Sequence, residues 1–325
     1  MAQTILTVKN LVTSFVLDQG EAHAVDDVSF TVDQGEVLGI VGESGCGKSV
    51  TSLSIMRLIQ KPGYIKSGEI IFNGINLLEI SDAEMRKIRG NKMTMIFQEP
   101  MTALNPVYTC GNQIEEVFKI HQPHLSPKQR KEKTIEILKK VGIPSPERRY
   151  HEYPHQLSGG MRQRIMIAMA IVCDPLLLIA DEPTTALDVT IQAQVLELIK
   201  ELRKQSQMAM ILITHDLGIV AEMCDKVAVM YGGKIIEYGP TDMIFAHPRH
   251  PYTLGLLRSI PSLHQGPTKS KLYNIPGSVP SLWEWPQGCR FYKRCERARD
   301  NCQRTPPMLT TQDGHQVACY YPITT

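Results

Sequence analysis

The pattern of apolar and polar positions divides the chain into a long regular body and a different final section. In the body, apolar runs of strand length alternate with stretches in which apolar residues recur every three or four positions. Two β-rich runs, Ile5–Val16 and Ala24–Val32, flank a turn-like segment near the N-terminus. Shorter apolar runs at Glu36–Val41, Gly68–Phe72 and Met93–Phe97 predict further strands.

Helical periodicity is clearest in the middle of the chain. Ser126-Pro127-Lys128-Gln129 has the composition of a helix start, with Ser as the cap, and the apolar spacing that follows ends at Gly142. A buried helix is predicted over Arg162–Cys173, where a methionine-rich stripe is interpreted as core. We also expect a helix over Lys48–Leu58.

Strands and helices then alternate until the character of the sequence changes. This rhythm favours an α/β fold with a mostly parallel core sheet, preceded by an antiparallel β subdomain at the N-terminus. After about Pro248 proline becomes frequent and the periodicity fades. The alternating segments are Leu176–Ala180, Ile191–Gln205, Met208–Thr214, Leu217–Cys224 and Lys226–Tyr231. We predict a main domain over residues 1–258, with a helical subdomain at about 100–165, and a small irregular extension over 259–325.

Composition narrows the classes of function. A hydrophobic fraction of 42% is ordinary for a globular protein, and a net charge of +2 gives no argument for binding nucleic acid. No run reaches the roughly 18 apolar residues that span a bilayer. Because the first residues also lack the pattern of a signal peptide, we expect a cytoplasmic chain whose eight cysteines do not form disulfides.

The segment Gly42–Ser49 has the spacing of a phosphate-binding loop. An apolar strand leads into it and a helix follows, so backbone N–H groups and the positive end of the helix dipole converge there. We expect Lys48 to contact the β- and γ-phosphates of a nucleotide and the hydroxyl of Ser49 to hold Mg²⁺. Cys46 is interpreted as a small spacer. The other positions of this loop are Gly42, Glu43, Ser44, Gly45 and Gly47.

A second apolar strand ends in the paired acids Asp181 and Glu182. A carboxylate at this place holds Mg²⁺ in phosphate-loop enzymes, and the neighbouring carboxylate can accept a proton from an attacking water. Gln98 and His215 also follow strands, and both side chains suit the positioning of water and the sensing of the γ-phosphate. Gln98 is in addition a candidate ligand of Mg²⁺.

These motifs occur together with Leu157-Ser158-Gly159-Gly160-Met161-Arg162-Gln163-Arg164. In this order the sequence resembles the nucleotide-binding subunit of ATP-binding cassette (ABC) transporters over about residues 5–240. The matching segments are the phosphate loop, the Gln loop at Gln98, the signature Leu157–Gln163, the acid pair, the D-loop Ala186-Leu187-Asp188 and the switch His215.

The resemblance implies an ATPase with a phosphate-loop NTPase (RecA-like) fold that works as a head-to-tail dimer. ATP on the loop of one subunit is then covered by Ser158, Gly159 and Gly160 of the other, which form a Gly-rich helix start suited to an anion. Phe15 lies where the family places an aromatic ring on adenine. Val50 departs from the Thr or Ser that many cassettes carry after the loop serine, which removes a hydroxyl near the α-phosphate.

Within this family the sequence is most similar to importer ATPases for oligopeptides, dipeptides and nickel. The similarity rests on the extended Gln loop Gln98–Pro106, on Ala180–Asp188 and on His250-Pro251-Tyr252-Thr253. It implies a second, different ATPase subunit, two membrane subunits, an external binding protein and a place at the cytoplasmic face of the bacterial inner membrane. This chain resembles the first of the two ATPases.

Four cysteines, Cys289, Cys295, Cys302 and Cys319, crowd into the final section. Four thiols in a loop-rich cytosolic segment suit a metal centre. A small extension with little apolar periodicity also needs a stabilising element such as a bound metal, because its hydrophobic core is small. The spacing leaves an iron–sulfur centre, zinc and no metal open. A [4Fe–4S] cluster is what the resemblance implies.

Two other functions are weighed against the importer. A soluble cassette ATPase acting on nucleic acid or ribosomes would use the basic final section, where nine Lys and Arg face four Asp and Glu from Arg258 onward. A regulatory module would use the cysteines to sense redox state and control ATP use.

Overall fold

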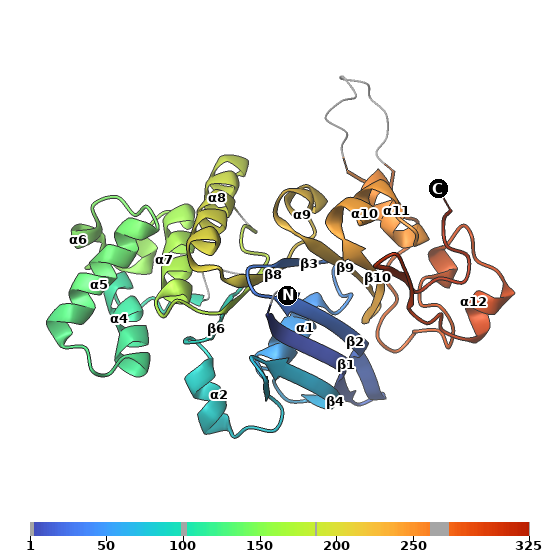
Figure 1. Cartoon of the computed structure of the whole chain (residues 1–325), viewed down its shortest axis with the longest axis horizontal. Coiled ribbons are helices and arrows are strands. Elements are labelled where there is room, and N and C mark those ends of the chain that lie inside the picture. The colour runs from blue at the N-terminus through green and yellow to red at the C-terminus, as the bar shows by residue number, and fades with distance from the viewer. Residues whose placement is uncertain (1–2, 99–102, 186, 261–272, 325) are drawn as a thin grey trace, which may run out of the picture. The chain divides into compact units, whose positions relative to one another are not determined.

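The structure is a computed structural model that describes residues 3–98, 103–185, 187–260 and 273–324, and it divides into two compact units (Figure 1). The first unit consists of Met1–Ile5, Val32–Glu36 and Glu79–Ile211. The second consists of Leu6–Thr31, Val37–Leu78 and Leu212–Thr325.

The sheet near the N-terminus is antiparallel, as the sequence predicts. Its strands follow the order β2-β1-β4-β5, and Leu6 of β1 lies opposite Phe72 of β4. Apolar side chains such as Val8 and Leu11 point into the core and are fully buried. The strands are β1 (Thr4–Leu17), β2 (Gly20–Asp33), β4 (Gly63–Phe72) and β5 (Ile75–Asn76).

A second set of strands in the second unit carries the loop Gly42–Ser49. The central pair, β3 (Val37–Val41) and β9 (Lys226–Tyr231), is parallel, and every residue of β3 is buried. The strand β10 (Lys234–Pro240) runs antiparallel to β9. Two short strands of the extension, β12 (His315–Val317) and β11 (Thr310–Gln312), continue the sheet beside β10. The extension is therefore less irregular than the sequence predicts.

The helices of the second unit are short. The first of them, α1, begins at Lys48 as predicted but ends at Ile55 rather than Leu58, because Arg57 adopts a positive φ of 52°. The helices are α1 (Lys48–Ile55), α9 (Leu217–Met223), α10 (Thr241–Ala246), α11 (Pro251–Arg258), the 3-10 turn η2 (Tyr292–Arg294) and α12 (Asp300–Arg304).

The first unit combines a parallel strand pair with a group of helices. The strands β6 (Met93–Ile96) and β7 (Leu177–Asp181) are parallel, with Ile96 opposite Ala180. The helices α4, α5, α6 and α7 pack together as the predicted helical subdomain (Figure 1, green). The helices are α2 (Asp82–Ile88), α4 (Cys110–His121), α5 (Pro127–Lys140), α6 (Pro146–Arg149), the 3-10 turn η1 (Pro154–Gln156), α7 (Gly159–Ile171) and α8 (Val189–Ser206). A further strand, β8 (Ala209–Ile213), begins in the first unit and ends in the second.

The start of α5 confirms the predicted cap. The side chain of Ser126 accepts from the backbone N–H of Gln129, and the Gln129 side chain accepts from the N–H of Ser126. By contrast, α7 begins at Gly159, three residues before the predicted Arg162.

A buried carboxylate attaches the extension to the rest of the second unit. Glu237 of β10 is fully buried and accepts hydrogen bonds from the backbone N–H groups of Arg249 (2.6 Å) and His250 (2.9 Å). Nε2 of His315, on β12, lies 2.7 Å from the same carboxylate. Because a buried carboxylate is stable only with such partners, these contacts fix β12 and the start of α11 against β10.

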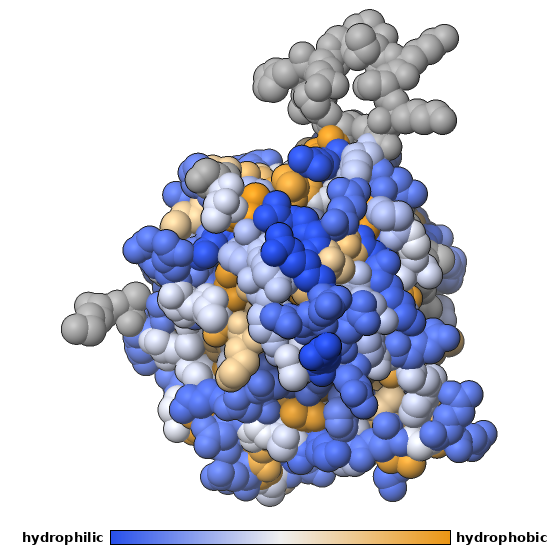
Figure 2. Space-filling view, turned by 90° about the vertical axis from the view of Figure 1, so that its right-hand side faces the viewer, coloured by the Kyte–Doolittle hydropathy of each residue, from blue (hydrophilic) through white to orange (hydrophobic). Residues whose placement is uncertain are grey.

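The face that carries the extension is mainly hydrophilic, with apolar residues in small separate patches (Figure 2). Patches of this kind are normal on a protein surface and do not by themselves mark a docking site. Within the described residues, no helix has the length and apolar character needed to cross a membrane.

Candidate nucleotide-binding and cysteine sites

The backbone of the loop Gly42–Ser49 requires glycine at two positions, Gly42 and Gly47. Gly42 has a φ of 150°, and a Cβ atom there would lie 2.3 Å from the carbonyl oxygen of Met230. Gly47 has a φ of 104°, and its Cβ would lie 2.6 Å from the carbonyl oxygen of Ala24. Larger residues would push the loop off β9 and β2, so these glycines allow the close turn from β3 into α1.

Lys48 lies at the start of α1 with its side chain turned back over the loop. Its ammonium donates to the carbonyl oxygens of Gly42 (2.8 Å) and Glu43 (3.1 Å), and the residue is buried. A positive charge thus lies beside a helix N-terminus and a loop of backbone N–H groups, an arrangement that binds phosphate.

The remaining predicted loop residues take different positions. Ser44 and Gly45 are exposed at the crest, while Ser49 and Val50 are half-buried in the first turn of α1. Cys46 is fully buried, and burial raises the pKa of its thiol. A buried, protonated thiol agrees with its interpretation as a spacer.

Phe15 lies near the end of β1, opposite Gly63, and is half-buried. A Cβ atom on Gly63 would lie 2.6 Å from the Phe15 ring, so this glycine leaves space for the aromatic side chain. The half-exposed ring is available for stacking, and its contact with adenine stays a prediction.

In the first unit, the structure brings the predicted Gln98 and Glu182 together. Nε2 of Gln98 donates to Oε2 of Glu182 at 2.9 Å. The parallel pairing of β6 and β7 explains this contact, because the carboxyl ends of parallel strands meet at the same sheet edge. Asp181, at the end of β7, is buried, whereas Glu182 is only half-buried. The second acid is therefore the one open to a water molecule.

Sequence reasoning missed Thr185, which orients the same carboxylate. Its hydroxyl donates to Oε2 of Glu182 at 2.9 Å, and its backbone N–H donates to the Glu182 carbonyl at 3.2 Å. Glu182 has a φ of 48°, so the chain turns sharply after β7. This turn places Thr185 beside the Glu182 carboxylate. The spacing of three residues between Glu182 and Thr185 is the sequence feature that could have indicated this contact.

The signature segment forms a helix start, as expected for an anion site. Ser158 is the N-cap of α7, and its hydroxyl accepts from the N–H of Met161 at 3.3 Å. Gly159 and Gly160 form the first turn. A Cβ on Gly160 would lie 2.6 Å from Cγ2 of Ile191 on α8, so glycine is required for the packing of α7 on α8.

Two further predicted residues also lie beside helix starts. Asp188 is the exposed N-cap of α8 and accepts from the N–H of Ile191 at 3.0 Å. His215 follows β8 in the second unit and is exposed, one residue before Asp216, the N-cap of α9. Part of the extended Gln loop, residues 99–102, and Ala186 of the D-loop lie outside the described residues.

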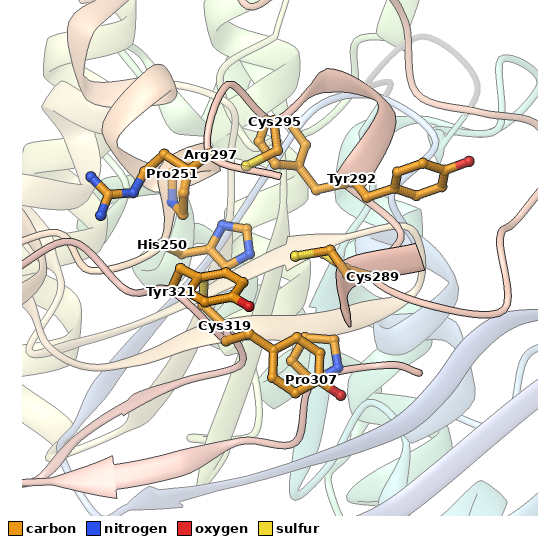
Figure 3. A pocket seen from close by; sticks show the side chains of 12 residues that line it. His250, Pro251, Cys289, Tyr292, Cys295, Arg297, Pro307, Cys319 and Tyr321 are labelled. Atoms are coloured by element: carbon orange, nitrogen blue, oxygen red, sulfur yellow. The ribbon is translucent and has the colours of Figure 1, made fainter. Parts of the chain in front are cut away.

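The four cysteines of the extension are free thiols that line one pocket (Figure 3). Phe291 and Tyr292 line it as well, together with His250 and Pro251 at the start of α11. The N–H of Cys289 donates to the carbonyl of Cys302 at 2.7 Å, which holds two of the cysteine segments side by side.

Burial raises the pKa of Cys289 to about 12 and that of Cys319 to about 11. These thiols therefore hold their protons at neutral pH, and a bound metal would have to displace them. Among the described residues, no three His, Cys, Asp or Glu side chains are grouped closely enough to hold a metal ion. At the place of the predicted metal centre, the structure therefore has four cysteines around one pocket, but their side chains are not arranged as a set of metal ligands.

Comparisons with known proteins identify the family. A family model described as "ABC transporter" matches residues 25–185, and another, "Oligopeptide/dipeptide transporter, C-terminal region", matches residues 236–302. The probable peptide ABC transporter ATP-binding protein y4tR of Sinorhizobium fredii is 52% identical over 98% of this chain and 95% of its own length. The dipeptide transport ATP-binding protein DppD of Escherichia coli is 51% identical over 98% and 97%.

The chain belongs to the ABC transporter family. This confirms the family predicted from the sequence. A solved dimeric bacterial ABC transporter cassette, MJ0796, covers 73% of this chain and 99% of its own length, with a TM-score of 0.66 and 26% identity. The predicted fold of an ABC cassette, with a mostly parallel sheet and an antiparallel N-terminal sheet, is therefore confirmed as well.

Proposed function

We propose that this chain is the ATP-hydrolysing subunit of an ABC importer for dipeptides and oligopeptides. The observation that carries the proposal is the carboxylate of Glu182, oriented by Gln98 and Thr185 in a chain that also holds a phosphate-binding loop. Relatives named for peptide and dipeptide transport match this chain over 98% of its length, which supports the choice of solute.

ATP binds with its phosphates on the loop Gly42–Ser49. The backbone N–H groups and the N-terminus of α1 stabilise the negative charge, and the Lys48 ammonium exchanges its carbonyl partners for phosphate oxygens. Phe15 stacks on the adenine. Mg²⁺, when bound, neutralises charge on the phosphates; Ser49, Asp181 and Gln98 offer the oxygen ligands that this ion prefers.

Hydrolysis transfers the γ-phosphoryl group to water. A carboxylate oxygen of Glu182 accepts the proton of the attacking water, while Gln98 and Thr185 keep that carboxylate in place through its other oxygen. His215 contacts the γ-phosphate and reports its presence. The products are ADP and inorganic phosphate.

The helix start at Ser158, Gly159 and Gly160 binds the ATP of a partner subunit, and Asp188 lies at the same dimer interface. A similar solved cassette is described as dimeric, which supports this assembly. We propose that the partner is a second, different ATPase subunit, and that two membrane subunits and an external substrate-binding protein complete the importer. The chain then lies peripherally at the cytoplasmic face of the inner membrane. Residues 1–258 form the nucleotide-binding domain and residues 259–325 the extension.

A test of the function uses the assembled importer. Co-expression with the membrane subunits of a peptide importer is expected to yield a complex whose ATP hydrolysis rises when dipeptide and the external binding protein are added together. Omission of the binding protein is the control. If nickel and not dipeptide stimulates hydrolysis, the proposed peptide substrate is wrong. If the chain never forms a complex with membrane subunits and binds RNA instead, the proposal that it is an importer subunit is wrong.

We further propose that Cys289, Cys295, Cys302 and Cys319 hold a [4Fe–4S] cluster, with zinc as the alternative. The chemistry of the donors suits such a cluster, because iron–sulfur clusters are held by four cysteine thiolates and four thiols line this pocket; the side chains would have to move closer together to bind it. When bound, the cluster staples these segments together and offers one-electron chemistry.

Chemical analysis distinguishes these alternatives. The chain purified without oxygen is expected to contain iron and acid-labile sulfide in equal amounts, and Cys302→Ser is expected to lose most of both. Cys173→Ser, at a cysteine outside the extension, is the control. Zinc without sulfide would support the alternative, and a metal-free wild-type chain would refute both.

A further inference from the structure

An ion pair joins the phosphate-binding loop to the cysteine-bearing extension. The guanidinium of Arg294 donates to the Glu43 carboxylate through both terminal nitrogens, at 2.6 and 2.9 Å. Glu43 is the second residue of the loop, and Arg294 directly precedes Cys295. Two motifs that are 251 residues apart in the sequence are thus in direct contact.

Arg294 is fixed from every side. Besides the two bonds to Glu43, Nε donates to the Pro276 carbonyl (2.8 Å), and the terminal nitrogens donate to the Tyr231 hydroxyl (3.3 Å) and the Ile275 carbonyl (3.4 Å). All five N–H donors are used, and the side chain is 5% exposed. Only an arginine can make this set of contacts, because lysine has a point charge and no planar fork.

Glu43 transmits this contact to the loop itself. Its N–H donates to the Tyr252 hydroxyl at 2.8 Å, and its carbonyl accepts from the Lys48 ammonium at 3.1 Å. A displacement of Glu43 therefore moves an acceptor of the lysine that binds phosphate.

The region around this pair is packed and does not depend on one bond alone. The rings of Tyr231, Tyr252 and Phe291 pack edge to face, with centroids 4.8 to 5.3 Å apart. Arg290, next to Cys289, stacks on Trp285 at 3.7 Å and donates to the carbonyl of Gly232. Removal of Arg294 should therefore leave the extension in place, which makes the pair testable.

The ion pair also has an electrostatic role at this position. Glu43 places a negative charge on a loop that binds negative phosphates, and an unpaired carboxylate there would repel them. Arg294 neutralises that charge and fixes its location.

We propose that Arg294 is a positioning residue for the phosphate-binding loop, and that through Glu43 it couples ATP binding to the order of the four-cysteine pocket. This inference rests on the proposed function, since it concerns the binding of ATP at the same loop. Coupling between two sites is reciprocal. The extension therefore raises the affinity for ATP, and ATP bound on the loop makes Cys295 less reactive.

The first experiment measures the affinity of the full-length chain for ATP with Mg²⁺. Arg294→Met is expected to weaken binding about tenfold, because the unpaired Glu43 carboxylate then faces the phosphates. The double variant Glu43→Gln with Arg294→Met is expected to recover most of this loss, because the repelling charge is gone. Arg304→Met, at an exposed arginine of the same extension, is the matched control and should bind as the wild type does.

The second experiment measures how fast iodoacetamide alkylates Cys295 with and without ATP, in full-length samples of equal metal content, because a cluster bound at Cys295 would itself block alkylation. In the wild type, ATP should slow alkylation several-fold; in Arg294→Met and in Glu43→Gln this protection should disappear at saturating ATP. A merely structural role of Arg294 would not abolish the protection in Glu43→Gln, which leaves the arginine intact. Should Arg294→Met fail to fold, Glu43→Gln alone still decides the matter.

Three results would overturn the inference: wild-type affinity in Arg294→Met, a double variant as weak as the single one, or equal ATP protection of Cys295 in the wild type and Glu43→Gln. If the wild-type chain itself binds no ATP, the proposed function fails, which is a different outcome.

Discussion

Glu182→Gln is expected to slow ATP hydrolysis by about 10²- to 10⁴-fold while ATP binding persists. The amide is as long as the carboxylate, so it keeps the sharp turn after β7 and can still accept from Gln98 or Thr185. It cannot accept the proton of the attacking water. The loss should therefore fall on the chemical step, seen as a low single-turnover rate with an almost unchanged dissociation constant for ATP.

The matched control for this prediction is Glu201→Gln, at an exposed acid in the second half of α8. It should hydrolyse ATP at the wild-type rate in the same assembly. A normal rate in Glu182→Gln would remove the acid from the role of general base. Weakened ATP binding together with slow hydrolysis would instead indicate that Glu182 holds the nucleotide.

Local sequence patterns predicted the phosphate-binding loop well, because its geometry depends on neighbouring residues. Gly42 and Gly47 have backbone angles that disfavour other residues, and Lys48 bonds to carbonyls within the same loop. The start of α5 was predicted for the same reason, since a Ser126 cap needs only the residue three positions later. The start of α7 was missed by three residues, because its glycines were assigned to a turn although Ser158 already caps the helix.

Contacts between distant segments could not be predicted with the same detail. The bond between Gln98 and Glu182 spans 84 residues and depends on the register in which Ile96 lies opposite Ala180. The sequence placed both side chains at strand ends, which gave the correct neighbourhood but not the hydrogen bond. Thr185 was missed because its role depends on the turn that Glu182 makes with a positive φ.

Contacts of the extension with distant segments were even harder to predict from the sequence. Its four cysteines suggested a separate, irregular module with a metal centre; in the structure they line one pocket but, among the described residues, form no group of metal ligands. Nothing in the local pattern indicated that Arg294 would reach Glu43 or that β12 would join the edge of β10. A contact over 251 residues is set by how the sheet folds, and the isolated run around Cys295 carries no periodicity that would place it.

Lys48→Met is expected to raise the dissociation constant for ATP by about 100-fold, which corresponds to the loss of charge-assisted bonds to phosphate. Methionine keeps the length and the apolar stem of the buried side chain but has no ammonium. The carbonyl oxygens of Gly42 and Glu43 then lose the hydrogen bonds that they accept from the Lys48 ammonium. Binding should be measured by titration of the full-length chain with ATP and Mg²⁺, and hydrolysis should fall in parallel at low ATP concentrations.

The control for Lys48 is Lys9→Met, which removes a lysine that is half exposed on β1 and forms a surface pair with Glu69 at 3.5 Å. Its affinity for ATP should not change, since exposed pairs contribute little. Thermal unfolding of both variants separates a binding defect from a folding defect: Lys48→Met should unfold near the wild-type temperature without nucleotide but lose the stabilisation that ATP gives. Normal ATP stabilisation in Lys48→Met would contradict the role of its ammonium, and the site of the triphosphate would then have to be sought away from this loop.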